Sequence, residues 1–224
     1  MNAGAVSSRW DELFRIALSI IDQAGARTRS FEGWSFGGGT ALMLQISHRE
    51  SHDIDLFLPD PQLLPLLNPV TQEYDVTPAP GTYQTDGSRS LKLVFKDIGE
   101  IDFICAPPLT VEPFEEQIIE DRRVALERPA EIIAKKIVHR GAHMQPRDMF
   151  DIAATMRVRG EDYLIDRLRP FRRECETALK TARRFDPEFA RSLISQLLIR
   201  EDFSDLPSSA QAMTIGLLEN ISGS

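Results

Sequence analysis

The stretch that decides the fold runs from residue 33 to residue 58 and reads GWSFGGGTALMLQISHRESHDIDLFL. Residues 33–36 predict a short strand that leads into three glycines, and residues 40–46 predict an apolar helix that opens directly on them. Glycines at such a junction let backbone N–H groups approach a phosphate closely, and the helix N-terminus adds partial positive charge. Residues 53–58 then predict a second strand, which a proline-rich stretch ends.

Carboxylates gather around this second strand. Residues i and i+2 of a strand face the same side, so Asp53 and Asp55 project together while their apolar neighbours face the core. Residues 101–105 predict a neighbouring strand, on which Asp102 supplies a third carboxylate. Carboxylates held together are costly without a cation, and Mg²⁺ prefers oxygen ligands of this kind. Three of them beside a phosphate-binding turn predict a two-metal site for phosphoryl or nucleotidyl transfer.

The rest of the chain divides into an α/β half and a helical half. Apolar spacing predicts a helix over 8–24, and residues 91–95 and 101–105 predict a hairpin that turns at 97–100. After Pro107-Pro108 the pattern is mostly helical, with segments expected at 129–141, 146–158, 160–168, 171–184 and 187–199. We therefore expect an α/β core over residues 1–110 and a mainly helical domain over residues 111–224 that completes the active-site cleft.

The composition is that of an ordinary globular protein, with 224 residues of which 42% are hydrophobic and 27% charged. No apolar run approaches the roughly 18 to 20 residues of a membrane-spanning helix, and the N-terminal stretch does not resemble a secretory signal. We therefore expect a cytoplasmic protein without a membrane partner. Cys105 and Cys175 are then expected to be packing residues in a reducing compartment.

The net charge of −8 is unevenly distributed. Residues 122–184 hold 16 Lys and Arg against 9 Asp and Glu, whereas the flanking segments are acidic. Such a basic segment suits a polyanion such as RNA or a nucleoside triphosphate, although solvated helix faces with local ion pairs are the simpler explanation of charge alone. Arg173, Lys180 and Arg184 share one helical face and are candidates for phosphate contacts.

A zinc site is the alternative that His48 and His52 raise by their i, i+4 spacing. Arg49 stands where a zinc-protease motif needs its Glu base, so the pattern disfavours this hypothesis.

The residues as a set resemble the AbiEii/AbiGii-type toxin nucleotidyltransferases of the DNA polymerase β-like superfamily. The resemblance covers about residues 30–155. Its first half rests on the turn Gly38-Gly39-Thr40, on Arg49-x-Ser51 and on Asp53-x-Asp55; its second half rests on the lysine of helix 131–140 and on Arg147-Asp148-x-x-Asp151. Lys135 and Lys136 compete for the family lysine, and the spacing favours Lys136.

The resemblance implies an α+β fold, with a small mixed-sheet nucleotidyltransferase core, flanking helices and a C-terminal helical bundle. It implies the following roles: Asp53, Asp55 and Asp102 as metal ligands, with Asp102 also helping to deprotonate the acceptor; Gly38, Gly39, Thr40, Arg49, Ser51 and Lys136 as nucleotide-binding residues; Lys136 and Asp148 as further catalytic residues. The cofactor implied is Mg²⁺, with Mn²⁺ as the alternative. For Asp148 and Asp151 a structural role competes, because a buried stripe lies beside Asp148 and Arg147 could pair with Asp151 at i, i+4.

Three functions follow. The leading one is an enzyme that transfers NMP from NTP to an acceptor hydroxyl, with the tRNA 3′ end as acceptor, as the toxin of a bacterial toxin–antitoxin or phage-defence pair with a cognate antitoxin. The second keeps the reaction but changes the acceptor to a protein hydroxyl or an aminoglycoside-like small molecule. The third is a nucleotide-binding regulator without catalysis, which the retention of three aspartates disfavours.

Overall fold

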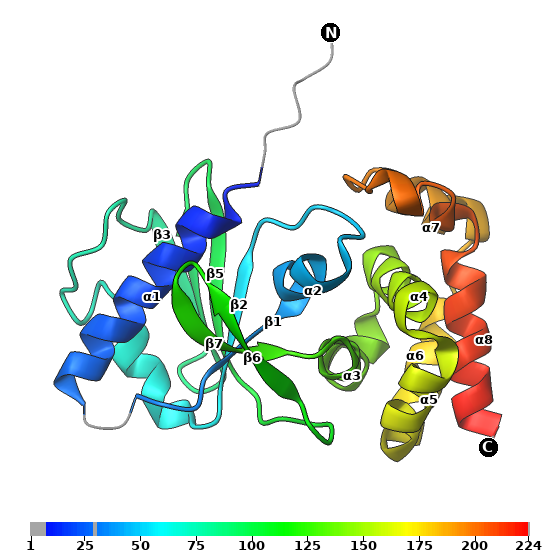
Figure 1. Cartoon of the computed structure of the whole chain (residues 1–224), viewed down its shortest axis with the longest axis horizontal. Coiled ribbons are helices and arrows are strands. Elements are labelled where there is room, and N and C mark those ends of the chain that lie inside the picture. The colour runs from blue at the N-terminus through cyan, green and yellow to red at the C-terminus, as the bar shows by residue number, and fades with distance from the viewer. Residues whose placement is uncertain (1–7, 29–30, 224) are drawn as a thin grey trace, which may run out of the picture. The chain divides into compact units, whose positions relative to one another are not determined.

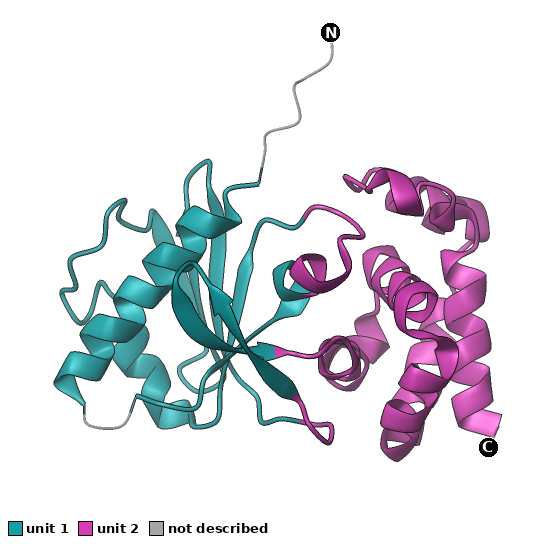
Figure 2. Cartoon of the chain, in the orientation of Figure 1, with its two compact units in different colours: residues 1–41, 51–108, 114–126 teal, residues 42–50, 109–113, 127–224 magenta. Residues whose placement is uncertain are grey.

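The computed structural model describes residues 8–28 and 31–223, which form two compact units (Figure 2). Unit 1 comprises residues up to 41 together with 51–108 and 114–126, and unit 2 comprises 42–50, 109–113 and 127 onward. The start of the predicted non-secretory N-terminus, residues 1–7, lies outside the described residues. No described helix has the length and apolarity needed to span a membrane.

Unit 1 is built on a mixed seven-stranded sheet with the order β3-β4-β5-β2-β1-β7-β6 (Figure 1). Its strands are β1 (Ser35–Gly37), β2 (Ile54–Leu58), β3 (Thr82–Thr85), β4 (Ser90–Phe95), β5 (Gly99–Cys105), β6 (Phe114–Ile119) and β7 (Arg122–Glu127). The strand β2 runs antiparallel to β1 and parallel to β5. The strands β4 and β5 form the predicted hairpin, but it turns at residues 96–98 rather than at 97–100, because Phe95 pairs with Gly99. The mixed sheet thus confirms the expected fold class.

One face of this sheet packs on α1 (Trp10–Arg27) and on the short helix η1 (Pro61–Leu67). The side chains of α1 that recur at helical spacing are buried, and Phe14 stacks on Phe36 of β1 with ring centroids 4.8 Å apart. Apolar side chains of β2, β4 and β5 point toward this core, for example Leu56, Leu93 and Phe103. Their polar neighbours are therefore left on the opposite face of the sheet.

Unit 2 is helical, as predicted. It contains α3 (Pro129–Arg140), η2 (Gly141–His143), α4 (Pro146–Arg159), α5 (Glu161–Leu168), η3 (Arg169–Phe171), α6 (Arg172–Ala182), α7 (Pro187–Ile194), η4 (Glu201–Phe203), η5 (Leu206–Ser208) and α8 (Ala210–Gly223). The helix α2 (Gly38–Ile46) begins in unit 1 and ends in unit 2. Within unit 2, α8 packs on α4 and α6, and the segment around Arg49 pairs with the segment around Ile199.

The structure differs from the sequence-based expectations at four elements. Within the stretch expected to be mostly helical, residues 114–127 form the hairpin β6–β7. This hairpin was not predicted, because β6 is a largely exposed edge strand without apolar alternation. Its turn uses Glu120 and Asp121 in left-handed conformation, with φ of 47° and 59°, rather than the Asn-Gly that marks such turns in sequence. The fully exposed β3 and the helix α8 were also not predicted, and α7 ends at Ile194 rather than near residue 199.

Candidate active site

Two of the three predicted metal-binding aspartates are direct neighbours in the sheet of unit 1. In the parallel pair β2–β5, Asp55 and Asp102 occupy opposite register positions, so their side chains leave the same face. Asp53 immediately precedes β2, two residues before Asp55. The predicted placement of Asp102 on a strand next to Asp55 is therefore confirmed, whereas the role of the three as ligands stays a prediction.

Gly38 lies against the carboxylate of Asp55. Gly37 is the register partner of Asp55 in β1–β2, and Gly38 follows with a φ of +71° at the start of α2. A Cβ atom added to Gly38 would stand 1.9 Å from Oδ2 of Asp55, which no packing adjustment tolerates while that carboxylate stays in place. Glycine is thus required here by both backbone conformation and contact, and the turn and the carboxylate are fitted to each other.

Thr40, a nucleotide-binding residue by the resemblance, ties the glycine turn to the aspartates. Its fully buried side chain donates a hydrogen bond from Oγ1 to the backbone carbonyl of Asp53, at 2.5 Å. The carboxylate of Asp53 in turn accepts from the backbone N–H of Glu100, at 3.0 Å to Oδ1. These two bonds fix the backbone and side chain of Asp53 between α2 and β5.

Lys92 is a residue of this cluster that the sequence analysis missed. It stands opposite Asp102 in the antiparallel pair β4–β5, with Nζ 3.0 Å from Oδ2 of Asp102, and it also forms an ion pair with Glu100. Burial raises the pKa of Asp102 above its usual range; Lys92 opposes this, while Glu100 and Asp53 add to it. Burial alone would lower the pKa of Lys92, but its two carboxylate partners outweigh burial and raise it.

The donor set of unit 1 fits a divalent cation in its chemistry, since carboxylate oxygens on one face of adjacent strands are what Mg²⁺ and Mn²⁺ bind. Within residues 8–28 and 31–223, however, no three His, Cys, Asp or Glu side chains are arranged so that they could hold a metal ion. In this structure the ammonium of Lys92 lies on Asp102, and Asp53 is held by the N–H of Glu100.

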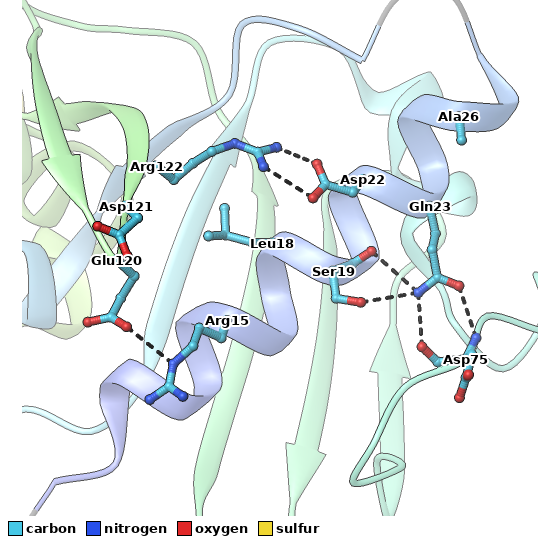
Figure 3. A pocket seen from close by; sticks show the side chains of 10 residues that line it. All are labelled: Arg15, Leu18, Ser19, Asp22, Gln23, Ala26, Asp75, Glu120, Asp121 and Arg122. Carbon is cyan, nitrogen blue, oxygen red and sulfur yellow. Dashed lines mark hydrogen bonds and ion pairs between the residues drawn. The ribbon is translucent and has the colours of Figure 1, made fainter.

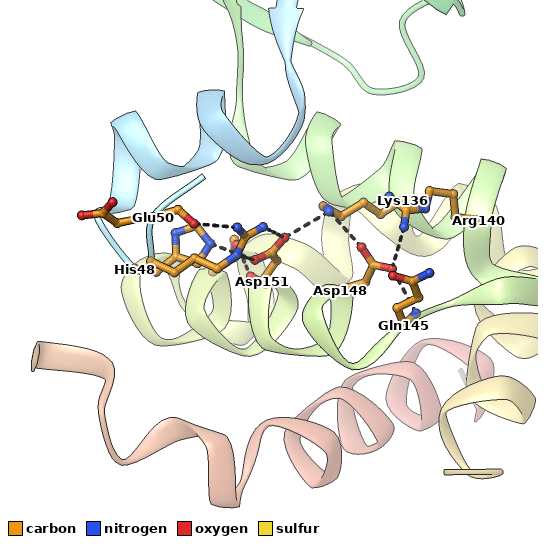
Figure 4. A network of polar contacts seen from close by, with 9 residues as sticks. His48, Glu50, Lys136, Arg140, Gln145, Asp148 and Asp151 are labelled. Carbon is orange, nitrogen blue, oxygen red and sulfur yellow. Dashed lines mark hydrogen bonds and ion pairs between the residues drawn. The ribbon is translucent and has the colours of Figure 1, made fainter. Parts of the chain in front are cut away.

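The other predicted site residues belong to a buried ionic network in unit 2, drawn in Figure 4. At its centre the carboxylate of Asp151 accepts hydrogen bonds from Arg49, with Nε at 2.8 Å and Nη2 at 3.0 Å, and contacts Nε2 of His48 at 2.9 Å. Burial alone would raise the pKa of Asp151, but Arg49 and Lys136 outweigh it and hold that pKa well below its usual range. Burial lowers the pKa of His48, against the pull of Asp151, so this imidazole is neutral at pH 7.

Lys136 joins the two acids of this network. Its Nζ lies 3.0 Å from Oδ2 of Asp151 and 2.9 Å from Oδ1 of Asp148. Oδ2 of Asp148 accepts from the backbone N–H of Gln145, the N-cap residue of α4, and lies 3.5 Å from Arg140. Burial opposes ionisation of both Lys136 and Asp148, yet the opposite charges around them raise the pKa of the lysine and lower that of the acid.

Two sequence-based readings of this region need correction or refinement. The expected i, i+4 pair between Arg147 and Asp151 is absent among the described contacts, because Arg147 is exposed and Asp151 is bound by Arg49 and Lys136. Lys135, the competitor for the family lysine, is buried in a separate pair with Glu127, at 2.5 Å. The two candidate lysines therefore belong to different buried ion pairs: Lys136 to the network of Asp148 and Asp151, and Lys135 to Glu127.

The remaining candidates have modest surroundings. Ser51 is half-buried and its carbonyl accepts from the hydroxyl of Ser8. Burial raises the pKa of the Cys105 thiol, and it raises that of Cys175 to about 12, so both stay protonated at neutral pH, as packing cysteines do. Nε2 of the His48 ring contacts Asp151 in the buried network of unit 2.

A pocket of about 660 Å³ in unit 1 is lined by none of the predicted site residues (Figure 3). Its wall is formed by α1 and by the β6–β7 turn, and its charged groups are largely paired, Arg122 with Asp22 and Arg15 with Glu120. We therefore place the candidate site at the aspartates of β2 and β5 rather than in this pocket.

Comparison with known proteins decides the family. A family model described as the nucleotidyl transferase AbiEii toxin of type IV toxin–antitoxin systems matches residues 23–219. The chain belongs to this family. It is thus a nucleotidyltransferase toxin of a type IV toxin–antitoxin system, and this membership implies an NTP substrate and a cognate antitoxin. Enzymes of this class generally use divalent metal ions.

The family match confirms the resemblance carried by the glycine turn and the aspartates, and it continues well beyond residue 155, where the sequence analysis ended it. Among solved structures the chain is similar to MenT4, a nucleotidyltransferase toxin of Mycobacterium tuberculosis H37Rv, at 17% identity and a TM-score of 0.49. The similarity covers 97% of this chain and 86% of that one. No curated protein matches the sequence.

Proposed function

We propose that this AbiEii-family chain transfers an NMP from an NTP to the 3′-terminal hydroxyl of tRNA in a Mg²⁺-dependent reaction. The observation that carries the proposal is the pairing of Asp55 with Asp102 on one face of unit 1, next to a glycine turn in direct contact with Asp55. Asp53, Asp55 and Asp102 are the proposed metal ligands. A bound divalent ion there would polarise the α-phosphate and neutralise charge on the triphosphate.

The residues of the chain have distinct parts in this reaction. The backbone N–H groups of Gly38 and Gly39, at the N-terminus of α2, suit the β- and γ-phosphates. The acceptor oxygen forms a bond to the α-phosphorus, the bond from that phosphorus to its bridging oxygen breaks, and pyrophosphate leaves. The proton of the acceptor hydroxyl passes to the carboxylate of Asp102 and then to water. Burial supports this role, because it raises the pKa of Asp102 and makes it a better base.

We assign Thr40, Arg49, Lys136 and Asp148 to positioning. Their polar atoms have protein partners: the hydroxyl of Thr40 holds Asp53, and the other three belong to the buried network of unit 2. The resemblance gives Lys136 a further role in neutralising the triphosphate, and Arg49 and Ser51 a role in binding the nucleotide. If Lys136→Met lost NTP affinity while its stability stayed unchanged, neutralisation of the triphosphate would be favoured over positioning as the role of Lys136.

The choice of tRNA rests on the charges of unit 2. Arg173, Lys180 and Arg184 are exposed and have no ion-pair partner among the described residues, unlike Arg172 and Arg183, which pair with Glu176 and Glu219. Unpaired cations on one helix and the turn after it suit a phosphate backbone, with affinity that falls as salt rises.

Label transfer tests the reaction. The purified chain with Mg²⁺ and total tRNA is given each α-labelled NTP in turn, with Asp55→Asn as the inactive control. We expect label on tRNA that depends on Asp55 and on one preferred base. Label on a protein or on an added aminoglycoside would overturn the choice of tRNA. NTP binding without any transfer would instead favour a non-catalytic regulator.

The acceptor surface has its own test. Reversing Arg173, Lys180 and Arg184 to Glu is expected to weaken tRNA binding at least about tenfold and to reduce its salt dependence, while NTP binding survives. The matched control reverses three exposed arginines that have ion-pair partners elsewhere: Arg9, Arg123 and Arg191. Equal effects of the two triple variants would reject this surface and leave the reaction itself untouched.

A further inference from the structure

We infer that Lys92 is a resident counter-cation of the active site, which holds Asp102 when no metal is bound and which a divalent ion must displace. This inference rests on the proposed function, in that it takes Asp102 as a metal ligand. It assigns to Lys92 a positioning role that sets how tightly the site binds its metal.

The register of the sheet fixes the position of Lys92. On β4 the side chains of Leu91, Leu93 and Phe95 are buried on the core face, so Lys92 points to the opposite face of the sheet. There it stands opposite Asp102 across the β4–β5 ladder, with Glu100 two residues before Asp102 on the same face. The pairing is thus built into the hairpin and does not depend on a flexible loop.

The balance of charge around Lys92 is unequal. Four carboxylates, those of Asp53, Asp55, Glu100 and Asp102, lie on or beside the two adjacent strands β2 and β5. Lys92 bridges two of them, Glu100 and Asp102. These two carboxylates therefore share one ammonium, and the three groups together keep a negative charge.

The ammonium of Lys92 occupies one of the two carboxylate oxygens of Asp102. With Nζ 3.0 Å from Oδ2, Lys92 takes a coordination direction of Asp102 that a metal would use. A divalent ion brings twice the charge and several oxygen ligands, so it can displace one ammonium, and Lys92 can keep Glu100 as its partner. Lys92 thus lowers the repulsion between the carboxylates of Glu100 and Asp102 in the metal-free protein, and it competes with the metal for Asp102.

The test measures metal binding rather than turnover. Lys92→Met keeps the length of the side chain and removes its charge; Lys92→Arg keeps the charge; Lys96→Met makes the same chemical change at an exposed lysine just beyond β4. Mn²⁺ affinity is measured by calorimetry on each full-length variant without nucleotide, and the thermal midpoint is measured in chelator.

We expect Lys92→Met to bind Mn²⁺ about tenfold more tightly than the wild type and to melt a few degrees lower in chelator. Lys92→Arg and Lys96→Met are expected to stay near the wild type in both measurements. Unchanged or weaker Mn²⁺ binding by Lys92→Met would overturn the inference, because a merely structural lysine lowers stability without tightening the metal.

An additional variant separates this inference from the proposed function. Asp102→Asn is expected to abolish most Mn²⁺ binding. If the wild type binds Mn²⁺ and Asp102→Asn does not, an indifferent Lys92→Met defeats only the counter-cation role. If neither the wild type nor any variant binds Mn²⁺, and no label is transferred, the proposed function fails with it.

Discussion

Two clusters of acidic side chains in this chain contrast in how their charge is balanced. In unit 1 the carboxylates around β2 and β5 are partly exposed; Glu100 and Asp102 share Lys92, and the side chain of Asp102 is 18% exposed. In unit 2, Asp148 and Asp151 are almost completely buried, at 1% and 0%, and are matched by Arg49, Lys136 and Arg140.

The contrast shows what each cluster can do. A buried carboxylate must be paired, and once it is paired with arginine and lysine it has little attraction left for a further cation. A half-exposed cluster with more acids than bases keeps that attraction. The same residue type is therefore held in buried ion pairs in unit 2, whereas in unit 1 it lies on the partly exposed face where we propose that the metal binds.

The largest effect on activity is expected from a substitution in the unit 1 cluster. Asp102→Asn keeps the shape of the side chain but removes the proposed base and metal ligand, so we expect nucleotidyl transfer to fall at least about 10³-fold. Because Asp102 is partly exposed and lies in a cluster of like charge, the free energy of unfolding should change little. Single-turnover label transfer and urea unfolding measure the two quantities. Full activity in this variant would place the chemistry elsewhere.

The next largest effect is expected from a substitution in the unit 2 network, which should lower stability rather than act on the chemical step. Asp151→Asn leaves Arg49 and Lys136 buried with too little negative charge, so we expect the free energy of unfolding to fall by about 3 kcal/mol. The control is Glu188→Gln in the exposed pair with Arg191, for which we expect less than about 0.5 kcal/mol. An Asp151→Asn protein of normal stability and no activity would instead make the network part of the chemistry.

A smaller effect sharpens the contact between the glycine turn and Asp55. Gly38→Ala adds a Cβ where the carboxylate of Asp55 lies, in a left-handed conformation; Gly87→Ala has a similar φ of +77° but no atom within 4 Å of the added Cβ. We expect about 1 kcal/mol of destabilisation for Gly87→Ala and about 2 kcal/mol for Gly38→Ala. Only Gly38→Ala should also lower transfer, at least about tenfold. Equal losses in both variants would show that Asp55 moves aside freely.

The part of this comparison that is local in sequence could be predicted from it. Glycines before an apolar helix and alternation around Asp53 and Asp55 predict the turn, the strand and the face, and the neighbouring strand carries Asp102 as expected. Lys92 was missed because the predicted turn at residues 97–100 would place residue 92 opposite residue 105. In the observed register Phe95 pairs with Gly99, which places Lys92 opposite Asp102.

The rest depends on contacts between distant parts of the chain. Arg49 and Asp151 are about a hundred positions apart, and nothing in local spacing selects this pair over Arg147 with Asp151. The hairpin β6–β7 was not predicted, because an exposed edge strand needs no apolar alternation. The helix α8 did carry a signal, since its buried residues recur at helical spacing: Ala210, Thr214, Leu217, Leu218 and Ile221.

The smallest expected effect tests how completely the unit 2 network is buried. The pKa of His48 is lowered in the folded chain, chiefly by burial, with Arg49 and Lys136 acting in the same direction and Asp151 against it. The unfolded chain therefore binds a proton at His48 below about pH 6.5, whereas the folded chain does not. Stability contributed by the neutral ring is present above that pH and is lost as the pH falls below it, at no more than about 1.4 kcal/mol per pH unit.

Urea unfolding between pH 7.5 and pH 5 measures this slope, and the range lies above the window in which the lowered pKa values of Asp148 and Asp151 act. His48→Gln, whose amide can reach Asp151, is expected to flatten the slope. His139→Gln is the matched control, since the pKa of His139 is also lowered, mainly by burial, but this ring is only partly covered. If the slope survives in His48→Gln and disappears in His139→Gln, the ring of His48 takes up a proton while folded. The network of unit 2 would then be as open to a further charge as the aspartates of unit 1.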